Sequence, residues 1–369
     1  MLTDRIEHKW IKAFVRVFEL SKVQSGDPVA IFSETQSRQI NVQLAELALL
    51  ELGAKAFHVV IPSAPVPWDM PTRSNGWVQG IQGIQPAIDA LARSSLVVDL
   101  TVESMLHNEE TRDILQAGSR MLCITNEHPE TLERVATDFS MKERVKRSAA
   151  LLNGSETMHV TSKAGTDLVV DLAGSMNQGA WGFCDEPGHL DVWPSGMVTC
   201  FPAAATVNGR LVMDRGDANL TFKRFLEAPV SLTFEDDFIS HIEGEGVDAE
   251  LFRSYTEHWG ERNAYASSHL GWGLNEKCHW ESTTFYDKVD SNGGEQRAFA
   301  GNFLFSTGVN AVAGRKTAGH YDIPMRNLSI RVDDKLVVEN GKLMEIGDDE
   351  APDVRGGMSE ISRHGYEGS

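Results

Sequence analysis

Short apolar runs alternate with amphipathic stretches through the first third of the chain. Apolar residues recur at helical spacing from Ile6 to Phe18 and from Ile40 to Leu50, after which Gly53 ends the second pattern. Short, mainly apolar runs fall at 29–32, 57–61, 96–100 and 121–125. Continuous apolar strands that alternate with helices are typical of a parallel sheet with both faces covered. We therefore predict an α/β domain with a parallel sheet over residues 1–150.

After residue 150 the hydrophobic period changes toward that of strands. Residues 157–162 and 167–172 predict a hairpin. Further short strands are expected at 198–201, 209–214, 230–234 and 238–242. One amphipathic helix, 249–259, interrupts them. We predict a β-rich α+β domain over 151–347, followed by a polar tail over 348–369 that is free or lies on a neighbouring subunit.

Charge and composition narrow the classes of partner. The 369 residues include 53 acidic and 34 basic side chains, and the resulting net charge of −19 repels nucleic-acid phosphates and anionic lipid. The chain opens without an apolar signal core and has no run of about 18 apolar residues, so we expect a cytoplasmic protein without membrane contact. Its four cysteines form no CxxC pair and predict neither a disulfide scaffold nor a thiolate zinc site.

Nucleotide-binding signatures are missing from the predicted parallel sheet. The turn after the first strand, 33–37, contains no glycine, whereas a dinucleotide site needs glycines there so that the backbone can approach the pyrophosphate. No GxxxxGKS/T phosphate loop occurs either. The remaining unusual feature is a total of 12 histidines and 32 glycines, which gather with aromatic residues toward the C-terminal half.

The sharpest candidate for metal chemistry is the motif Gly319-His-Tyr-Asp-Ile-Pro324. On a strand, His320 and Asp322 point to the same side and Tyr321 points to the other. An imidazole and a carboxylate are two members of the 2-His-1-carboxylate triad, which holds Fe(II) and leaves positions open for substrate and O2. The other interpretation of this short pattern is a hydrogen-bonded His–Asp pair at the end of a strand.

The third ligand is open among four histidines: His241, His258, His269 and His279. His258 lies on the predicted amphipathic helix and is expected at the surface, and an exposed loop is expected for His279. His241 and Glu243 form a rival pair with the same i, i+2 spacing, in an acidic stretch that favours a solvated edge. His269 shortly precedes Gly271, and glycine allows close backbone approach beside a ligand or a bend.

Three ordered motifs carry a resemblance to a known family. They are His269-Leu-Gly-Trp-Gly-Leu-Asn275, Gly301-Asn-Phe-Leu-Phe-Ser-Thr-Gly308 and Gly319-His-Tyr-Asp-Ile-Pro324. With these motifs the chain resembles the 2,5-dihydroxypyridine 5,6-dioxygenases, ring-opening enzymes of bacterial nicotinate and nicotine breakdown, over residues 5–345. That family is similar in fold to the metalloenzymes called aminopeptidase T.

The resemblance implies a ligand set for one Fe(II). By motif, His269, His320 and Asp322 hold the metal, and Ser306 lies near the substrate and orients it. In aminopeptidase T a carboxylate stands at the position of His269, and the histidine of its H-x-A-x-G motif falls near Leu304 here. Ligands for a second metal are then missing, which argues against two-metal peptide hydrolysis.

Two histidines outside the metal motifs are candidates for acid/base work. Leu106 and His107 follow the third predicted strand, at the sheet end where ligands collect. The resemblance places a leucine–histidine pair and another histidine around the bound ring, and His189 is a looser match to the latter. Because an imidazole can accept a hydroxyl proton near neutral pH, we expect His107 or His189 to be the acid/base residue.

The reaction that the resemblance implies is the opening of the C5–C6 bond of 2,5-dihydroxypyridine by both atoms of O2, which gives N-formylmaleamic acid. A homo-oligomer is expected because aminopeptidase-like folds usually assemble. The first alternative is an aminopeptidase T-like hydrolase with Zn or Co and with Glu243 or Glu245 among its ligands. The others are a dioxygenase of another hydroxylated pyridine or a catechol, and a binding or assembly protein that has lost its metal site.

Overall fold

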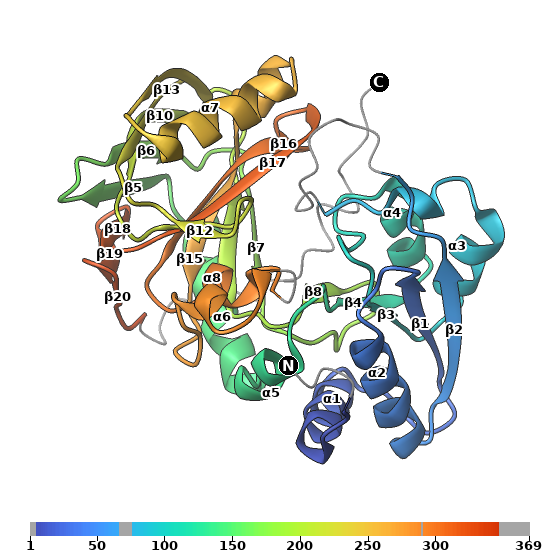
Figure 1. Cartoon of the computed structure of the whole chain (residues 1–369). Helices are drawn as coiled ribbons and strands as arrows, with labels where there is room; N and C mark the ends of the chain where they lie inside the picture. The colour runs from blue at the N-terminus through green and yellow to red at the C-terminus, as the bar shows by residue number, and fades with distance from the viewer. Residues whose placement is uncertain (1–4, 66–75, 289–290, 347–369) are drawn as a thin grey trace.

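A parallel sheet organises the N-terminal part of the chain (Figure 1). The computed structural model describes residues 5–65, 76–288 and 291–346, and within them this sheet has the strand order β2-β1-β3-β4-β8. Its strands are β1 (Pro28–Glu34), β2 (Lys55–Ile61), β3 (Leu96–Asp99), β4 (Arg120–Cys123) and β8 (Leu190–Val192). All neighbours pair in parallel, which confirms the predicted sheet and its first four strands.

Helices cover both faces of the parallel sheet because its strands are apolar on both sides. They are α1 (His8–Leu20), α2 (Gln39–Glu51), α3 (Gln85–Ala92), α4 (Glu109–Gln116), α5 (Pro129–Arg134) and the 3-10 turn η1 (Gln79–Ile81). Val29 and Ile31 of β1 belong to the core cluster that contains α1 and α2. Ala30 and Phe32, on the opposite side of the same strand, belong to the cluster that contains α3 and α4.

Antiparallel sheets build the C-terminal part of the described chain. The larger one has the order β14-β13-β10-β6-β5-β18-β19-β20. Its strands are β5 (Thr157–Ser162), β6 (Asp167–Asp171), β10 (Val207–Met213), β13 (Val230–Glu235), β14 (Phe238–Glu243), β18 (Leu328–Val332), β19 (Lys335–Glu339) and β20 (Lys342–Leu343). The pairing of β5 with β6 confirms the predicted hairpin.

The second antiparallel sheet has the order β17-β16-β15-β9-β7 and carries most of the candidate chemistry. Its strands are β7 (Met176–Ala180), β9 (Met197–Phe201), β15 (Ser267–Gly273), β16 (Phe303–Asn310) and β17 (Arg315–Met325). The remaining elements are β11 (Ala218–Asn219), β12 (Arg224–Phe225), α6 (Phe139–Asn153), α7 (Val247–His258), α8 (Gly294–Ala298), η2 (Arg262–Tyr265) and η3 (Ser282–Thr284). The two sheets share one core, in which Phe234 of β13 meets Phe305 of β16 edge to face at 5.3 Å.

Two elements do not follow the predicted division of the chain at residue 150. Helix α6 begins before it but packs on β7 and β9 of the second antiparallel sheet. Strand β8 comes after it and yet pairs with β4 in the parallel sheet. The domain limits stay a prediction, and the predicted tail, 348–369, lies outside the described residues. Within the described ranges, no helix is both long and apolar enough to cross a membrane.

Candidate functional site

A cavity of about 90 Å³ lies where the parallel sheet meets the second antiparallel sheet. One wall consists of residues just beyond the carboxyl ends of β3, β4 and β8, where ligands collect in α/β sheets: Glu103, Leu106, His107, Thr125, Glu127, Val192, Trp193 and Pro194. The remaining lining comes from Gly76 and from the C-terminal part: Met197, Phe201, His269, Asn292, Gly294, Arg297, His320 and Asp322.

Three side chains of this lining have the chemistry of metal ligands. His269 lies on β15, and His320 and Asp322 lie on β17. One candidate ligand atom from each falls within 4.8 Å of the others, and this is the only such cluster of three or more His, Cys, Asp or Glu in the described part of the chain. His320 Nε2 lies 3.2 Å from Asp322 Oδ1, and the rings of His269 and His320 have centroids 5.3 Å apart. The structure thus brings together the three predicted ligands.

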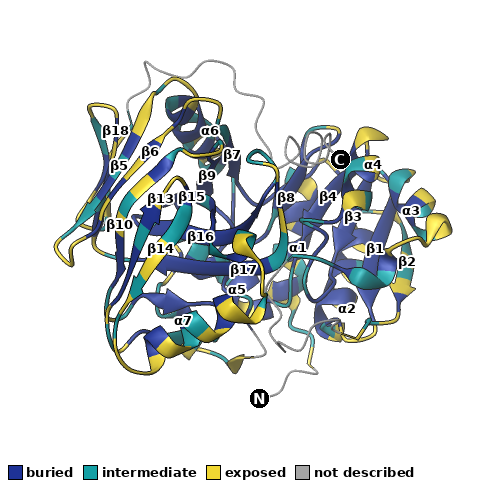
Figure 2. Cartoon of the chain, turned by 90° about the horizontal axis from the view of Figure 1, so that it is seen from above, coloured by how far each residue is buried: buried dark blue, intermediate teal, exposed yellow. Residues whose placement is uncertain are grey.

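Strand pairing explains how residues far apart in sequence meet. β16 is buried along its length and lies between β15 and β17 (Figure 2). Ser306 of β16 pairs with Asp322 of β17. The i, i+2 spacing turns His320 and Asp322 to one side, while Tyr321 packs against Phe252 on the other at 4.9 Å. A side chain at Gly271 of β15 would overlap the carbonyl of Val198, so the predicted close backbone approach after His269 is confirmed.

The donor set fits a divalent transition metal. Burial lowers the pKa of His269 to about 3, so its imidazole is neutral and keeps a lone pair for a metal. Burial alone would raise the pKa of Asp322, but interactions with His320 and Arg297 hold it well below its ordinary value. The buried Nδ1 atoms of His269 and His320 have no hydrogen-bond partner among the described residues. Two imidazoles and one carboxylate in contact are the ligands of the facial triad.

Asp322 is held from two sides by Ser306 and Arg297. The Ser306 hydroxyl donates to Asp322 Oδ1 and lies 3.4 Å from His269 Nε2. Ser306 is fully buried, and its contacts are with the candidate ligands rather than with the cavity. Arg297 Nε donates to Asp322 Oδ2 at 2.7 Å. The sequence carried no signal for Arg297, which lies on the five-residue helix α8.

Leu106 and His107 lie at the cavity as predicted. The centroid of the His107 ring is 5.6 Å from that of His320. Burial, and next the neighbouring imidazoles of His320 and His269, lower the pKa of His107 to about 3, so the ring is neutral and one of its nitrogens carries a lone pair. Gly76 packs against the His107 ring. The carbonyl of Gly76 accepts a hydrogen bond from the backbone N–H of His107 at 2.8 Å, and a Cβ added at Gly76 would lie 2.9 Å from His107 Cδ2.

His189, in contrast, is not brought to the cavity. It directly precedes β8, at the end of the strand opposite to the carboxyl end. The residue is 2 % exposed, its ring centroid lies 4.6 Å from that of Trp181, and its Nε2 lies 3.7 Å from Asp191 Oδ2. Its surroundings are those of a core histidine. The sequence did not reveal the three-residue strand β8, and from that segment Val192, Trp193 and Pro194 reach the cavity instead.

The rival metal candidates stay apart. His241, His258 and His279 are exposed, as expected for the last two. Glu243 forms a surface ion pair with Arg210, with 3.1 Å between Oε2 and the guanidinium nitrogen. The open choice of third ligand therefore falls to His269.

Sequence reasoning missed the acidic and polar side of the cavity. Glu127 is 2 % exposed and accepts a hydrogen bond from Gly294 N at 2.7 Å, and burial raises its pKa to about 7. Thr125 Oγ1 accepts from Asn292 Nδ2 at 2.7 Å. Both Thr125 and Glu127 follow β4 as His107 follows β3, so the rule that pointed to His107 could have found them.

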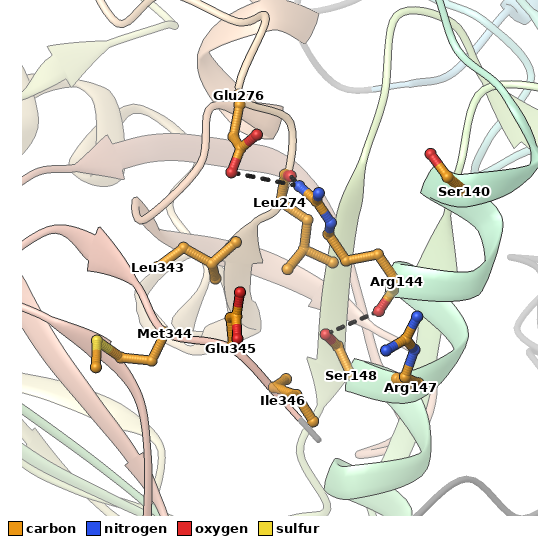
Figure 3. A pocket seen from close by; sticks show the side chains of 10 residues that line it. All are labelled: Ser140, Arg144, Arg147, Ser148, Leu274, Glu276, Leu343, Met344, Glu345 and Ile346. Atoms are coloured by element: carbon orange, nitrogen blue, oxygen red, sulfur yellow. Dashed lines mark hydrogen bonds and ion pairs between the residues drawn. The ribbon is translucent and has the colours of Figure 1, made fainter. Parts of the chain in front are cut away.

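A larger cavity of about 430 Å³ lies elsewhere, between α6 and the segment that ends the described chain (Figure 3). Its most prominent cation, Arg144, donates to the carbonyl of Leu274 at 2.9 Å and lies 3.7 Å from Glu276 Oε1. No cluster of metal-ligating residues within the described chain lies there. The smaller cavity is therefore the candidate for catalysis.

Comparison with known proteins gives a consistent result. The family model of the 2,5-dihydroxypyridine 5,6-dioxygenases matches residues 9–345. A protein of Pseudomonas putida KT2440 named 2,5-dihydroxypyridine 5,6-dioxygenase is 36 % identical over 335 residues, which are 90 % of this chain and 95 % of that protein.

Solved structures agree with the sequence comparison. The structure of 2,5-dihydroxypyridine dioxygenase from P. putida KT2440 superposes with a TM-score of 0.87 at 35 % identity and covers 93 % of this chain and 98 % of that one. Wild-type AmpT from Thermus thermophilus has a TM-score of 0.62 at 15 % identity and covers 91 % of this chain and 99 % of that one. The second likeness shows the fold alone.

Proposed function

This chain belongs to the 2,5-dihydroxypyridine 5,6-dioxygenase family, and from that membership we propose that it opens the ring of 2,5-dihydroxypyridine with O2. The C5–C6 bond breaks and each carbon gains one oxygen atom, so C5 becomes a carboxylic acid and C6 a formyl carbon in N-formylmaleamic acid. The observation that carries the proposal is the meeting of His269, His320 and Asp322 in a cavity that His107 also lines.

We assign Fe(II) to the three ligands because the set matches the facial triad of non-haem oxygenases. Bound there, Fe(II) supplies the redox chemistry through which the ring and O2 react. Asp322 contributes the negative charge of the set, and Arg297 and Ser306 keep its two oxygens in place. The Nε2 atoms support this assignment, since that of His320 lies 3.2 Å from Asp322 Oδ1 and that of His269 lies 3.4 Å from the Ser306 hydroxyl that contacts the same oxygen.

His107 is the proposed acid/base residue. Its neutral imidazole lies beside His320 and can accept the proton of the substrate's 5-hydroxyl. Loss of that proton makes the pyridine ring more electron-rich. Leu106 and Phe201 give the cavity apolar surface against which a flat ring can stack. Among the described residues the cavity is small, about 90 Å³, which suits a single ring better than a peptide.

The test is metal analysis together with O2 consumption. An anaerobically iron-loaded sample should bind one iron per chain, and on exposure to air it should bleach 2,5-dihydroxypyridine while consuming one O2 per ring. His320→Ala should lose iron and turnover together. Unchanged substrate absorbance with the wild-type protein would refute the proposal, and stoichiometric iron in the variant would remove His320 from the site.

The same sample decides between the proposed activity and its alternatives. Two metals per chain and O2-independent cleavage of a leucine anilide would favour an aminopeptidase, although Glu243 pairs with Arg210 on the surface. Faster O2 uptake with a catechol or another hydroxypyridine would favour a different ring substrate. Absence of redox-active iron would favour a binding protein.

We further propose that the protein works in nicotinate or nicotine degradation, in the cytoplasm and as a homo-oligomer. The four cysteines are free and buried, which suits a reducing compartment. Leu50 of α2 and Val60 of β2 are 56 % and 59 % exposed and lie on the outer side of the parallel sheet, where a second subunit could cover them. Light scattering on the purified full chain measures the assembly, and a monomer would contradict it.

A further inference from the structure

The cavity has a second polar group besides the candidate metal ligands, and this second pole is formed by Thr125 and Glu127. Asp322 accepts from Arg297 at 2.7 Å, the Arg297 guanidinium donates to the carbonyl of Asn292 at 2.6 Å, and the Asn292 amide donates to Thr125 Oγ1 at 2.7 Å. All four residues line the same cavity. Glu127 lines it as well, two residues beyond Thr125. Thr125 is thus joined to Asp322 along the cavity wall through Arg297 and Asn292, so a ring that meets the metal ligands with one part can reach Thr125 and Glu127 with another.

This second pole offers one acceptor and one donor. The Glu127 carboxyl accepts from Gly294 N, and its pKa also reflects a backbone hydrogen bond from Asn292. A carboxylate has about four acceptor positions, so some remain for a ligand. Thr125 accepts with its oxygen, and among the described residues its hydroxyl hydrogen has no acceptor. A buried acceptor and a hydroxyl donor, two residues apart in the chain, thus both line the cavity.

The substrate of the proposed function has the complementary edge. In 2,5-dihydroxypyridine C2 lies para to C5, the carbon whose hydroxyl faces the metal ligands, and the ring nitrogen lies between C2 and C6. In its lactam form the nitrogen carries a hydrogen and the C2 oxygen is an acceptor. We propose, on the basis of that function, that Glu127 accepts the ring N–H and Thr125 donates to the C2 oxygen, and that this pair selects a hydroxypyridine over a carbocyclic diol.

The position of Glu127 is held by the surrounding fold. A Cβ at Gly294 would lie 3.0 Å from Glu127 Oε1 and 3.3 Å from the ring of Pro194, so only glycine leaves room for the carboxyl in its present place. Burial makes a lost hydrogen bond costly, and a ring without the N–H would leave Glu127 with its backbone hydrogen bonds alone. Discrimination by this means is expected to reach about tenfold to a hundredfold.

The test compares 2,5-dihydroxypyridine with hydroquinone, its carbocyclic analogue, which lacks only the ring nitrogen. Equilibrium binding of both to the anaerobic, iron-loaded full chain gives a ratio of dissociation constants. Glu127→Leu should lower the preference for the pyridine by about tenfold or more, because a leucine offers no acceptor. Glu127→Gln retains an acceptor oxygen and should keep most of the preference. Thr125→Val, which is nearly isosteric, should lower it as well.

A structural role for Glu127 would weaken both ligands equally and leave the ratio unchanged. Glu130→Gln, on the exposed side of the same segment, is the matched control and should change neither dissociation constant. If the ratio of the two dissociation constants is unchanged in both Glu127→Leu and Thr125→Val, the inference is overturned. The inference is also overturned if the preference for the pyridine changes in Glu103→Gln and in neither of those two variants. If the wild-type protein turns over the substrate but does not prefer it to hydroquinone, only the inference fails. If it neither binds nor turns over the substrate, the proposed function fails too.

Discussion

Replacement of Arg297 by methionine tests how the fold keeps a charged ligand in place. The guanidinium and the carboxylate of Asp322 are 14 % and 3 % exposed, with 2.7 Å between Nε and Oδ2. At an effective dielectric constant of about 20, the Coulomb attraction at this distance is about 6 kcal/mol before desolvation is subtracted. Removal of one partner from a buried pair costs about 3–5 kcal/mol. Because Ser306 and His320 still contact Asp322 in the variant, we expect Arg297→Met to lower the free energy of unfolding by about 3 kcal/mol, the lower end of this range.

The loss of stability in Arg297→Met should be smaller when a metal is bound than when it is absent. A divalent ion at the three ligands would compensate the Asp322 charge that Arg297→Met leaves alone. The free energy of unfolding should therefore fall by about 3 kcal/mol in chelator and by less than about half of that in the anaerobic, iron-loaded protein. By linkage, the variant gains more stability from the metal than the wild-type protein does.

Urea unfolding followed by tryptophan fluorescence measures both states. Arg331→Met, at an exposed arginine of β18, is the matched control and should stay within about 0.5 kcal/mol of the wild type. If Arg297→Met behaves like this control in chelator, Asp322 does not depend on Arg297. An equal loss with and without iron would mean that the arginine supports α8 rather than the ligand charge.

Three further outcomes are expected. Burial raises the pKa of Glu127 from 4.5 to about 7, so as the pH rises the unfolded chain loses this proton before the folded protein does. Between these two pH values, the free energy of unfolding of the wild type relative to Glu127→Gln should fall by up to about 3 kcal/mol. Urea unfolding that gives the same difference between the two proteins at both ends of this window would contradict the prediction. Gly76→Ala should lower turnover about tenfold to a hundredfold with iron content unchanged, because its Cβ displaces the His107 ring, while Gly83→Ala, also at positive φ but with no neighbour within 4 Å, should not. Removal of the metal should lower the thermal midpoint, because metal at a hundredfold excess over its Kd adds about 2.7 kcal/mol to the free energy of unfolding. In calorimetry, His320→Ala should have the same midpoint with and without the metal.

The sequence predicted what depends on local pattern. Short apolar runs indicated β1 to β4, because strands buried on both faces lack a polar side. The i, i+2 spacing of His320 and Asp322 indicated a shared side of a strand, because side chains alternate along a strand. The helix–strand alternation placed His107 at the carboxyl end of a parallel strand, and the family resemblance made it a site candidate. The family resemblance, rather than spacing, singled out His269 from the other histidines.

The remainder depends on contacts between distant segments, which local pattern does not encode. β8 has three residues, too few for a period, and it follows a turn-rich segment, so His189 was expected in a loop near the ring instead of in the core. Arg297 lies on a helix of five residues whose position is set by the fold around it. Glu127 was within reach of the same rule that found His107, but its burial against Gly294 is a tertiary property.

The late return of β8 to the parallel sheet affects the order in which the chain can acquire its structure during synthesis. β4 leaves the ribosome with an open edge, and that edge stays open while α6 and the strands β5 to β7 are made. An open edge can pair with strands of another chain, so the nascent protein passes through a stage that is prone to aggregation. The closing segment also contributes Val192, Trp193 and Pro194 to the cavity. A nascent chain therefore gains its last parallel strand and part of one wall of the candidate cavity in the same event.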